Sequence, residues 1–265
     1  MTSAKRAAQR PVALTIAGSD NSAGAGIQAD LKTFSRLGCY GLTAVTCVVA
    51  EIPGKVAAIQ PIKPEIVASQ VALSFQAFPV AAAKTGMLFS TPIIEAVAQE
   101  LSTTKVSLVI DPVMVASSGD PLLKKSAISA YFRLLFPLAT LITPNLDELQ
   151  ILAGRQVRNL EEMKEAGRAL VDQYGCAFLL KGGHLRGKVA VDFLATADGF
   201  KEFSAPFVRG VDTHGTGCTY SAAITAGLAN GKPLSQAVGV AKRHITKAIT
   251  GSLRWGRTCA LDQFA

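Results

Sequence analysis

The feature that most constrains the fold is a repeated pattern in which a short apolar run ends in polar or glycine residues and helical periodicity then follows. Four such runs, VALTIAGSD, VSLVIDPVM, TLITPNLDE and AFLLKGGH, begin at residues 12, 106, 140 and 177. The alternation predicts βα units on a mainly parallel sheet that is flanked by helices. Because ligands bind outside the carboxyl ends of such strands, we expect the four polar ends to converge on one cleft.

Amphipathic helices are expected between these runs. In residues 24–38, Ile27, Leu31 and Phe34 recur at helical spacing, and Gly38 is placed to end the helix in a left-handed conformation. Further helices are expected, with boundaries uncertain by about 2–4 residues, at 91–101, 122–135, 161–174, 217–229 and 234–250.

Length and composition favour one globular domain. Of the 265 residues, 49% are hydrophobic and 17% charged, and the 23 glycines suit a compact fold with many tight turns. Single α/β domains reach this length, and the chain shows neither an internal repeat nor a long linker. We therefore expect residues 11–265 to form one domain and residues 1–10 a flexible tail. An Arg-rich organellar address is the alternative interpretation of those ten residues.

Charge and cysteine content narrow the possible partners and the cellular compartment. The 27 Lys and Arg residues give a net charge of +8 but form no basic and aromatic strip, so nucleic-acid binding is not expected. A general positive field would instead attract anionic small molecules such as phosphates. The five cysteines lack disulfide or zinc-ligand patterns. No segment approaches the ~20 apolar residues of a membrane span. We expect a cytoplasmic protein without membrane or nucleic-acid partners.

The stretch DTHGTGCTYSAA, residues 212–223, predicts an anion hole at a helix start. Gly215 and Gly217 leave backbone N–H groups open to a ligand, and the helix adds its partial positive charge. A glycine-rich turn that only caps a helix is the alternative. The Cys218 thiol is expected to be acidified there and to serve as a base or nucleophile, unless it is a small buried filler.

A resemblance to a known family runs through the same motifs. The segment ALTIAGSDNSAGAGIQADLKTFSRLGCYGLTAVT, residues 13–46, resembles the opening of the hydroxymethylpyrimidine/phosphomethylpyrimidine kinases of thiamine biosynthesis, which are ribokinase-like. KTGML, DPVMVASSGDPLL, TPNLDE, LLKGGH and DTHGTGCT follow in family order, so the likeness covers most of residues 13–230.

The resemblance implies a ribokinase-like fold and an ATP-dependent kinase. The kinase would phosphorylate the hydroxymethyl group of 4-amino-5-hydroxymethyl-2-methylpyrimidine and would then phosphorylate the resulting monophosphate. Mg²⁺ is the implied metal and a homodimer the implied assembly.

The resemblance also gives the anion hole a catalytic role. Cys218 stands where related sugar kinases carry an aspartate as general base, and the pyrimidine kinases have cysteine there. Phosphoryl transfer requires alignment of the hydroxyl and neutralisation of charge on the phosphoryl oxygens. The backbone N–H groups of Gly215, Thr216, Gly217 and Cys218 would neutralise that charge. The thiol could instead mainly position the hydroxyl, because a loose transition state needs little base strength.

Nucleotide and metal contacts follow from the same resemblance. Lys181 matches a lysine that contacts the ATP phosphates, although a solvated loop lysine is the alternative. Asn145 and Glu148 match a pair that organises Mg²⁺ and its waters, and hard oxygen ligands suit that ion. The same pair fits a helix capping box, and both roles can hold at once. Asp111 resembles an acidic residue near the phosphates and magnesium, or it forms an Asp-Pro turn. Thr213 is expected on the nucleotide side.

The pyrimidine pocket is expected to include Gly18, Asp20, Glu51 and Met87. Met87 also suits an ordinary core position, and Glu51 could face solvent before a turn. Two departures from the family stand out. Glu51 occupies a position where better-known members carry glutamine, and the C-terminal ITGSLRWGRTCALDQFA lacks the family's glycine-proline ending.

Two other functions remain open on the sequence. A pyridoxal kinase of the same superfamily would also act on an aromatic ring with a hydroxymethyl arm. A catalytically idle, ligand-binding relative would keep only the fold. The intact GTGC motif and Lys181 argue against the idle relative, because a decayed site loses such groups first. His184 and His214 are expected to be neutral turn residues without a catalytic role.

Overall fold

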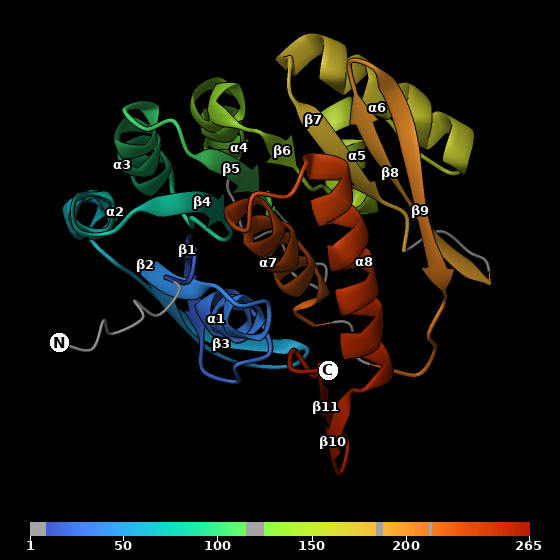
Figure 1. The fold of residues 1–265 in the computed structure, drawn as a ribbon, viewed down its shortest axis with the longest axis horizontal. Coiled ribbons are helices and arrows are strands. Elements are labelled where there is room, and N and C mark those ends of the chain that lie inside the picture. Colours follow the sequence, from blue (N-terminus) through green and yellow to red (C-terminus); the bar gives the residue numbers. More distant parts are fainter. Residues whose placement is uncertain (1–8, 115–124, 184–187, 212–213) are drawn as a thin grey trace, which may run out of the picture.

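The computed structural model describes residues 9–114, 125–183, 188–211 and 214–265 (Figure 1). Within them, nine strands form one sheet in the order β3-β2-β1-β4-β5-β6-β7-β8-β9, and β10 pairs with β11 in a separate hairpin. The strands are β1 (Val12–Asp20), β2 (Tyr40–Ile52), β3 (Lys55–Pro61), β4 (Val80–Thr85), β5 (Ser107–Ile110), β6 (Leu141–Ile142), β7 (Ala177–Lys181), β8 (Val189–Thr196), β9 (Gly199–Pro206), β10 (Leu253–Trp255) and β11 (Thr258–Ala260).

The sheet is mainly parallel, as the sequence predicted. Strands β2, β1, β4, β5, β6 and β7 pair in parallel, and antiparallel strands lie at both edges. At one edge β3 pairs antiparallel with β2, and at the other β8 and β9 extend the sheet from β7. These edge strands follow hairpin turns, so they carry no βα signal in the sequence.

Helices cover both faces of the sheet (Figure 1). One face packs against α1, α7 and α8, and the other against α2 to α6. The helices are α1 (Gly26–Arg36), α2 (Pro64–Ala77), α3 (Thr91–Ser102), α4 (Lys125–Ala130), α5 (Leu146–Ala153), α6 (Leu160–Tyr174), α7 (Thr216–Ala229) and α8 (Leu234–Thr250).

Two helical segments differ from the sequence-based expectation. The expected helix 122–135 is described from residue 125 on, where a short α-helix passes into a π-helical turn, Tyr131–Leu135. Residues 122–124 lie outside the described residues. Helix α2 was not predicted, because only Val67 and Val71 among its residues are buried and its other apolar side chains interrupt any single stripe.

The core lies on both sides of the central strands. Leu108 and Ile110 of β5 face the α2–α6 layer, whereas Val109 between them faces α7 and α8. Successive side chains of a strand point to opposite faces, so a strand buried on both faces is a continuous apolar run. This packing explains why the apolar runs in the sequence mark the parallel strands.

The fold brings polar strand ends to one edge of the sheet. Strands β1, β5 and β7 run parallel and end at Asp20, Ile110 and Lys181, and the chain continues into Asp111 after β5. The chain leaves β1 in one direction toward β2 and crosses to the other side for β4, so the edge beside β1 is a topological switch point. Helix α7 begins at Thr216 above this same edge.

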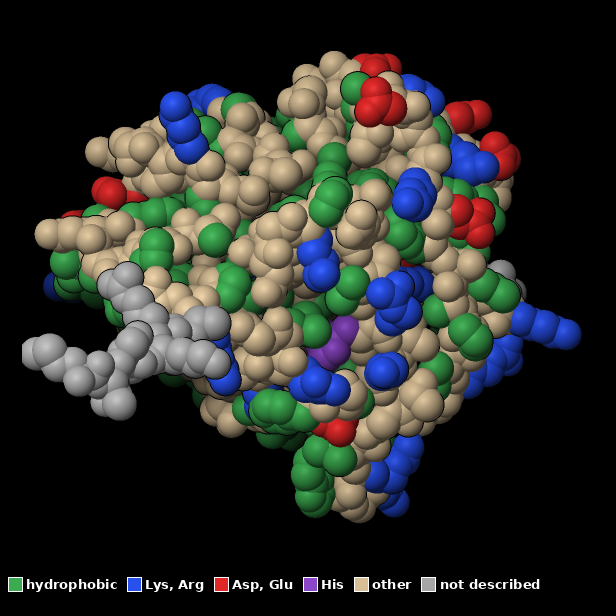
Figure 2. Space-filling view, in the orientation of Figure 1, with side chains coloured by type: hydrophobic (Ala, Val, Ile, Leu, Met, Phe, Trp, Pro, Cys, Tyr) green, Lys and Arg blue, Asp and Glu red, His purple; other side chains and the backbone are tan. Residues whose placement is uncertain are grey.

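Within the described residues, the helix lengths and the surface do not by themselves identify a binding partner. In the described part of the chain, every helix is too short or too polar to cross a bilayer. Figure 2 shows one face, on which Lys and Arg side chains are mostly separated by apolar and other side chains. The five cysteines are unpaired thiols.

Candidate active site

The first turn of α7, where the sequence predicts the anion hole, is a helix start capped by glycine. Gly215 caps the helix with a φ of +78°, a conformation that favours glycine. A Cβ atom there would collide with the carbonyl oxygen of Gly24. A Cβ at Gly217 would lie 3.3 Å from Asp111 Oδ2 and 3.4 Å from Lys181 Nζ. The start of α7 therefore rests directly on a charged pair from β5 and β7.

Lys181 and Asp111 form a partly buried ion pair below this turn. The Nζ atom of Lys181 lies 3.1 Å from Asp111 Oδ1. Thr143 and Ser221 donate their hydroxyls to the two oxygens of Asp111 at 3.2 and 3.3 Å. Burial acts to lower the pKa of Lys181, but the carboxyl groups of Asp111 and Glu148 outweigh it and raise the pKa above the usual value. Lys181 is therefore a fixed cation at the floor of the anion hole.

Cys218 lies in the same turn, but its thiol is not acidified as expected. Burial raises its pKa to about 12, and the positive charge of Lys84 lowers it only in part. The nearby carboxyl groups of Asp30 and Asp111 raise it further. Desolvation of the thiolate thus outweighs the helix start and the lysine, and Cys218 is a neutral thiol at pH 7.

A fully buried ion pair lies behind Cys218. The Nζ atom of Lys84, at the end of β4, lies 2.9 and 2.8 Å from the two oxygens of Asp30 in α1. Thr15 donates its hydroxyl to Asp30 at 2.6 Å. Neither charged side chain is exposed. Sequence reasoning missed this pair, because its members are 54 residues apart and belong to different elements.

Asn145 and Glu148 form the predicted capping box at the start of α5. Asn145 Oδ1 accepts from the Glu148 N–H, and Glu148 Oε2 accepts from the Asn145 N–H, both at 2.9 Å. Glu148 Oε1 also accepts from the Met114 N–H at 3.2 Å. Burial raises the pKa of Glu148 to about 7, with Lys181 opposing and Asp111 adding to the shift. Each carboxylate oxygen keeps one lone pair for a further contact.

Asp20 organises the loop between β1 and α1. Its carboxylate accepts from Ser22 N at 2.7 Å, Gly24 N at 3.1 Å and Ala25 N at 2.8 Å. His214 Nε2 lies 3.1 Å from Asp20 Oδ2. Burial acts to raise the pKa of Asp20, but these hydrogen bonds, that of His214 above all, lower it to about 2. Asp20 is therefore an ionised anchor of the loop.

His214 lies beside the cavity and links Asp20 to the anion hole, a position that sequence reasoning did not give it. Ligand atoms of Asp20, Glu51 and His214 lie within 4.8 Å of one another. Glu51 lines the cavity, and burial together with the charge of Asp20 raises its pKa. The backbone N–H of Glu51 donates to Asn21 Oδ1 at 2.7 Å, which ties the end of β2 to the loop after β1.

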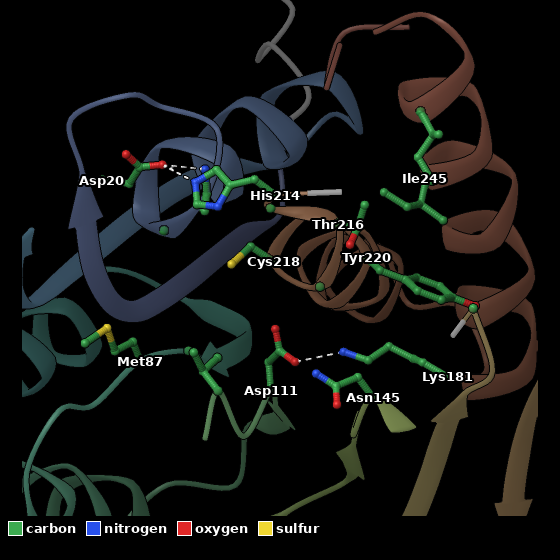
Figure 3. A pocket seen from close by; sticks show the side chains of 18 of the residues that line it. Asp20, Met87, Asp111, Asn145, Lys181, His214, Thr216, Cys218, Tyr220 and Ile245 are labelled. Atoms are coloured by element: carbon green, nitrogen blue, oxygen red, sulfur yellow. Dashed lines mark hydrogen bonds and ion pairs between the residues drawn. The ribbon is translucent and has the colours of Figure 1, made fainter. Parts of the chain in front are cut away.

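One cavity of about 480 Å³ joins these groups. In Figure 3 Cys218 lies between the Asp20–His214 pair and the Asp111–Lys181 pair, with Met87 on one side and Tyr220 and Ile245 on the other. Thr213 lies outside the described residues. The other expected site residues all line the cavity: Gly18, Asp20, Glu51, Met87, Asp111, Asn145, Glu148, Lys181, Gly215, Thr216, Gly217 and Cys218.

A second polar network borders the far end of the cavity and was not predicted. Asp192 of β8 accepts from the Gly182 N–H at 3.0 Å, the Tyr220 hydroxyl at 3.1 Å and Lys242 Nζ at 2.7 Å. It therefore ties the end of β7 to α7 and α8. Its members show no common motif, because each lies in a different element. Apolar groups beside it line the same end: Ala205, Pro206, Phe207, Val208, Ile245 and Ile249.

Comparisons with known proteins identify the family of the chain. The family model described as phosphomethylpyrimidine kinase matches residues 20–261. The hydroxymethylpyrimidine/phosphomethylpyrimidine kinase of Salmonella typhimurium is 46% identical over 91% of this chain and 91% of its own length. The thiamine biosynthesis bifunctional protein ThiED of Geobacter sulfurreducens is 44% identical over 92% of this chain, which spans 50% of that longer protein.

The solved structures that resemble this chain include a phosphomethylpyrimidine kinase and a pyridoxal kinase. The ADP complex of Bacillus subtilis pyridoxal kinase superposes with a TM-score of 0.89 at 37% identity, covering 96% of this chain and 98% of that chain. Phosphomethylpyrimidine kinase of Clostridium difficile 630 superposes with a TM-score of 0.80 at 40% identity, covering 90% and 99%. The model match and the identities over most of both chains show that the chain belongs to the phosphomethylpyrimidine kinase family.

Proposed function

We propose that this protein transfers the γ-phosphoryl group of ATP to the hydroxymethyl group of 4-amino-5-hydroxymethyl-2-methylpyrimidine and then phosphorylates the monophosphate. The observation that carries the proposal is the order of groups in the cavity. In Figure 3 Met87 and Asp20 lie on one side of Cys218, and Lys181, Tyr220 and Ile245 lie on the other. Glu51 lies close to Asp20, because their ligand atoms are within 4.8 Å of each other. An alcohol and a nucleotide can thus approach the anion hole from opposite ends.

The transfer step uses alignment and charge neutralisation. The substrate hydroxyl oxygen forms a bond to the γ-phosphorus while the bond to the ADP oxygen breaks. Lys181 and the N–H groups at the start of α7 stabilise the charge on the phosphoryl oxygens. Because the Cys218 thiol is neutral, it accepts a hydrogen bond from the hydroxyl and orients it. The hydroxyl proton leaves late and passes to an oxygen of the transferred phosphoryl group, as the loose transition state allows.

The nucleotide and its metal have suitable partners in the cavity. The apolar residues beside Tyr220 offer a surface for the adenine base, and the related pyridoxal kinase of Bacillus subtilis was solved with ADP. Asp111, Asn145 and Glu148 present oxygen atoms next to Lys181. Hard oxygen ligands fit Mg²⁺, so these three residues would hold the ion, which would supply positive charge to neutralise the phosphates.

Glu51 is the residue on which the substrate assignment depends. A bidentate pair with the exocyclic amino group and the adjacent ring nitrogen of the pyrimidine needs one shared proton, either on the carboxyl group or on the ring. Burial and the charge of Asp20 raise the pKa of Glu51, which favours uptake of that proton. Pyridoxal has no such amino group. Pyridoxal phosphorylation is nevertheless the second candidate, because a pyridoxal kinase superposes with a TM-score of 0.89.

Product analysis separates the two candidates. The protein is incubated with ATP, Mg²⁺ and an equimolar mixture of the pyrimidine alcohol and pyridoxal, and products are identified by mass spectrometry. We expect pyrimidine monophosphate first and diphosphate later, at a rate above that of pyridoxal phosphate. A faster conversion of pyridoxal would reassign the substrate, and no ADP with either alcohol would refute the kinase proposal.

The role of Glu51 has its own measurement. The proton shared by Glu51 and the aminopyrimidine is lost as the pH rises, so the dissociation constant of the pyrimidine alcohol should increase between pH 5.5 and 8.5. Glu51→Gln keeps an acceptor and a donor at all these pH values, and its profile should be flat. Identical profiles for the two proteins would remove Glu51 from the substrate contact.

We also propose a cytoplasmic homodimer. Apolar side chains are exposed on β2, β3 and α2. The rings of Tyr40 and Phe78 stack with their centroids 5.9 Å apart, although these residues are 53% and 39% exposed. An exposed apolar group of this kind favours association of two copies of the chain. The unpaired cysteines suit a reducing compartment. The members of the exposed group are Tyr40, Val48, Ile52, Val56, Ile66, Leu73 and Phe78.

A further inference from the structure

The residues after β11 fold back onto the body of the protein. Leu261 is buried in the core beside α7 and α8. The Asp262 N–H donates to the Ala248 carbonyl at 3.1 Å, and Arg36 Nε donates to the Phe264 carbonyl at 2.7 Å. Figure 1 shows the C-terminus beside α1 and the base of α8. We call residues 261–264 the C-terminal segment.

Gln263 reaches from this segment to the loop between β1 and α1. Its side chain is 1% exposed, and its Nε2 donates to the Gly24 carbonyl at 3.3 Å in a buried hydrogen bond. A carbonyl oxygen can only accept, so the amide nitrogen must face it. Without this donor the described contacts of the buried Gly24 carbonyl include no other hydrogen bond, and an unpaired buried carbonyl is costly.

Gly24 is the point at which the loop meets the anion hole. Its N–H donates to Asp20, and its carbonyl oxygen lies where a side chain of Gly215 would stand. A Cβ atom on Gly24 would lie 2.9 Å from Cδ2 of His214. If Gly24 shifted, its atoms would therefore press against both Gly215 and His214. The loop has little room to move, because tightly packed contacts transmit small displacements.

The backbone of the loop also needs support from outside. Ala23 has a φ of +58° and Gly26 a φ of +57°, and the conformation at Ala23 is strained for a residue with a side chain. Lys32 Nζ donates to the Ala23 carbonyl at 2.7 Å, and Gln263 supplies the corresponding bond to Gly24. Each of these hydrogen bonds offsets part of the strain.

We propose that Gln263 is a positioning residue that holds the Gly24 loop against the anion hole. The C-terminal segment thereby fixes the position of the loop at the end of the cavity where the alcohol binds. The family model match covers residues 20–261, so Gly24 lies within the matched range and Gln263 lies outside it. The proposal rests on the proposed function for its effect on the alcohol. Its effect on the loop does not depend on that function.

The test compares Gln263→Met and Gln263→Glu with Phe264→Ala in the full chain. Methionine keeps the length of the side chain without a donor, and glutamate replaces the donor by an acceptor. Phe264 is 58% exposed and contacts Arg36 through its backbone, which alanine retains, so it is the matched control in the same segment.

The first measurement is amide hydrogen exchange of residues 20–26, followed by mass spectrometry without ligands. Loss of one neutral hydrogen bond should speed exchange of this loop about two- to tenfold in both Gln263 variants. Phe264→Ala should exchange at the wild-type rate. Wild-type exchange in Gln263→Met, or equal acceleration in Phe264→Ala, would overturn the proposal.

The second measurement separates positioning from general destabilisation. Both Gln263 variants should bind the pyrimidine alcohol about two- to tenfold more weakly and bind ATP with the wild-type dissociation constant. Equal weakening of both ligands, or faster exchange throughout the protein, would make Gln263 merely structural. If the wild type converts neither alcohol, the proposed function fails, and the exchange comparison alone decides the role of Gln263.

Discussion

At the scale of single residues, Cys218 shows how two physical effects compete at one atom. A helix start and a buried lysine favour a thiolate, but removal of the sulfur from water favours the neutral thiol. The desolvation effect is larger here, and the pKa is raised to about 12. A thiol with this pKa is protonated at pH 7 and does not act as the base that the motif suggested. It can still orient a hydroxyl, which is what phosphoryl transfer requires most.

Alkylation by iodoacetamide tests the neutral thiol. Only the thiolate reacts, so Cys218 in the ligand-free protein should react far more slowly at pH 8 than glutathione. Its rate should then increase about tenfold per pH unit up to pH 11, whereas a free thiol with a pKa of ~8.5 levels off. Peptide mass spectrometry separates Cys218 from the other four cysteines. A rate that levels off near pH 7 would show an acidified thiol.

Gly215→Ala tests the backbone geometry of the anion hole. An alanine Cβ would collide with the Gly24 carbonyl, so the turn must move and the N–H groups lose their alignment. Loss of one aligned donor lowers kcat by about 10²–10³-fold in other oxyanion sites, and we expect a decrease of that order. Gly231→Ala is the matched control, since it has a φ of +72° and open space around it. Equal kcat values for the two variants would contradict the assignment.

At the scale of secondary-structure elements, the sequence was most informative where a residue pattern is local. The parallel strands β1, β5, β6 and β7 and most helices follow from short apolar runs and helical spacing, whereas the parallel strands β2 and β4 were not among the predicted runs. Helix α2 and the edge strands β3, β8 and β9 were missed, because exposed apolar residues and hairpin turns give no clear period. The contact between α1 and β4 was also missed, since Asp30 and Lys84 pair only after folding.

The Asp30–Lys84 pair gives a stability prediction. Lys84→Met leaves the carboxylate of Asp30 buried without its cation, which should lower the free energy of unfolding by about 3–5 kcal/mol. Lys84→Met combined with Asp30→Leu removes both charges and should recover most of the loss. Urea unfolding measures the difference. A single variant as stable as the wild type would mean that Asp30 takes up a proton or gains access to water.

At the scale of the whole molecule, the site is assembled from segments that are far apart in the sequence. The site residues assigned from the family motifs line one cavity, apart from Thr213, which lies outside the described residues. The roles of His214, the Asp192 network and Gln263 could not be assigned, because they depend on partners up to 239 residues away. Periodicity and motif spacing contain no information on such distant pairs.

The exposed apolar group on β2, β3 and α2 gives a prediction for the assembly. Leu73 is 60% exposed, and Leu73→Glu should place a charge in the interface and shift the molar mass toward that of one chain. Val189→Glu is the control, because Val189 is 49% exposed but lies on β8 at the opposite side of the sheet. Light scattering after size-exclusion chromatography measures the mass. A wild type with the mass of one chain would contradict the homodimer.

The most direct test of the account is the rate of pyrimidine phosphate formation by Cys218→Ala. The backbone anion hole and Lys181 remain in this variant, so it should fold and bind ATP like the wild type. Loss of the group that orients the hydroxyl should lower turnover about 10²-fold, within the range for groups that act on a reacting hydroxyl. Retention of more than half of the wild-type turnover would contradict a role for Cys218 in the transfer.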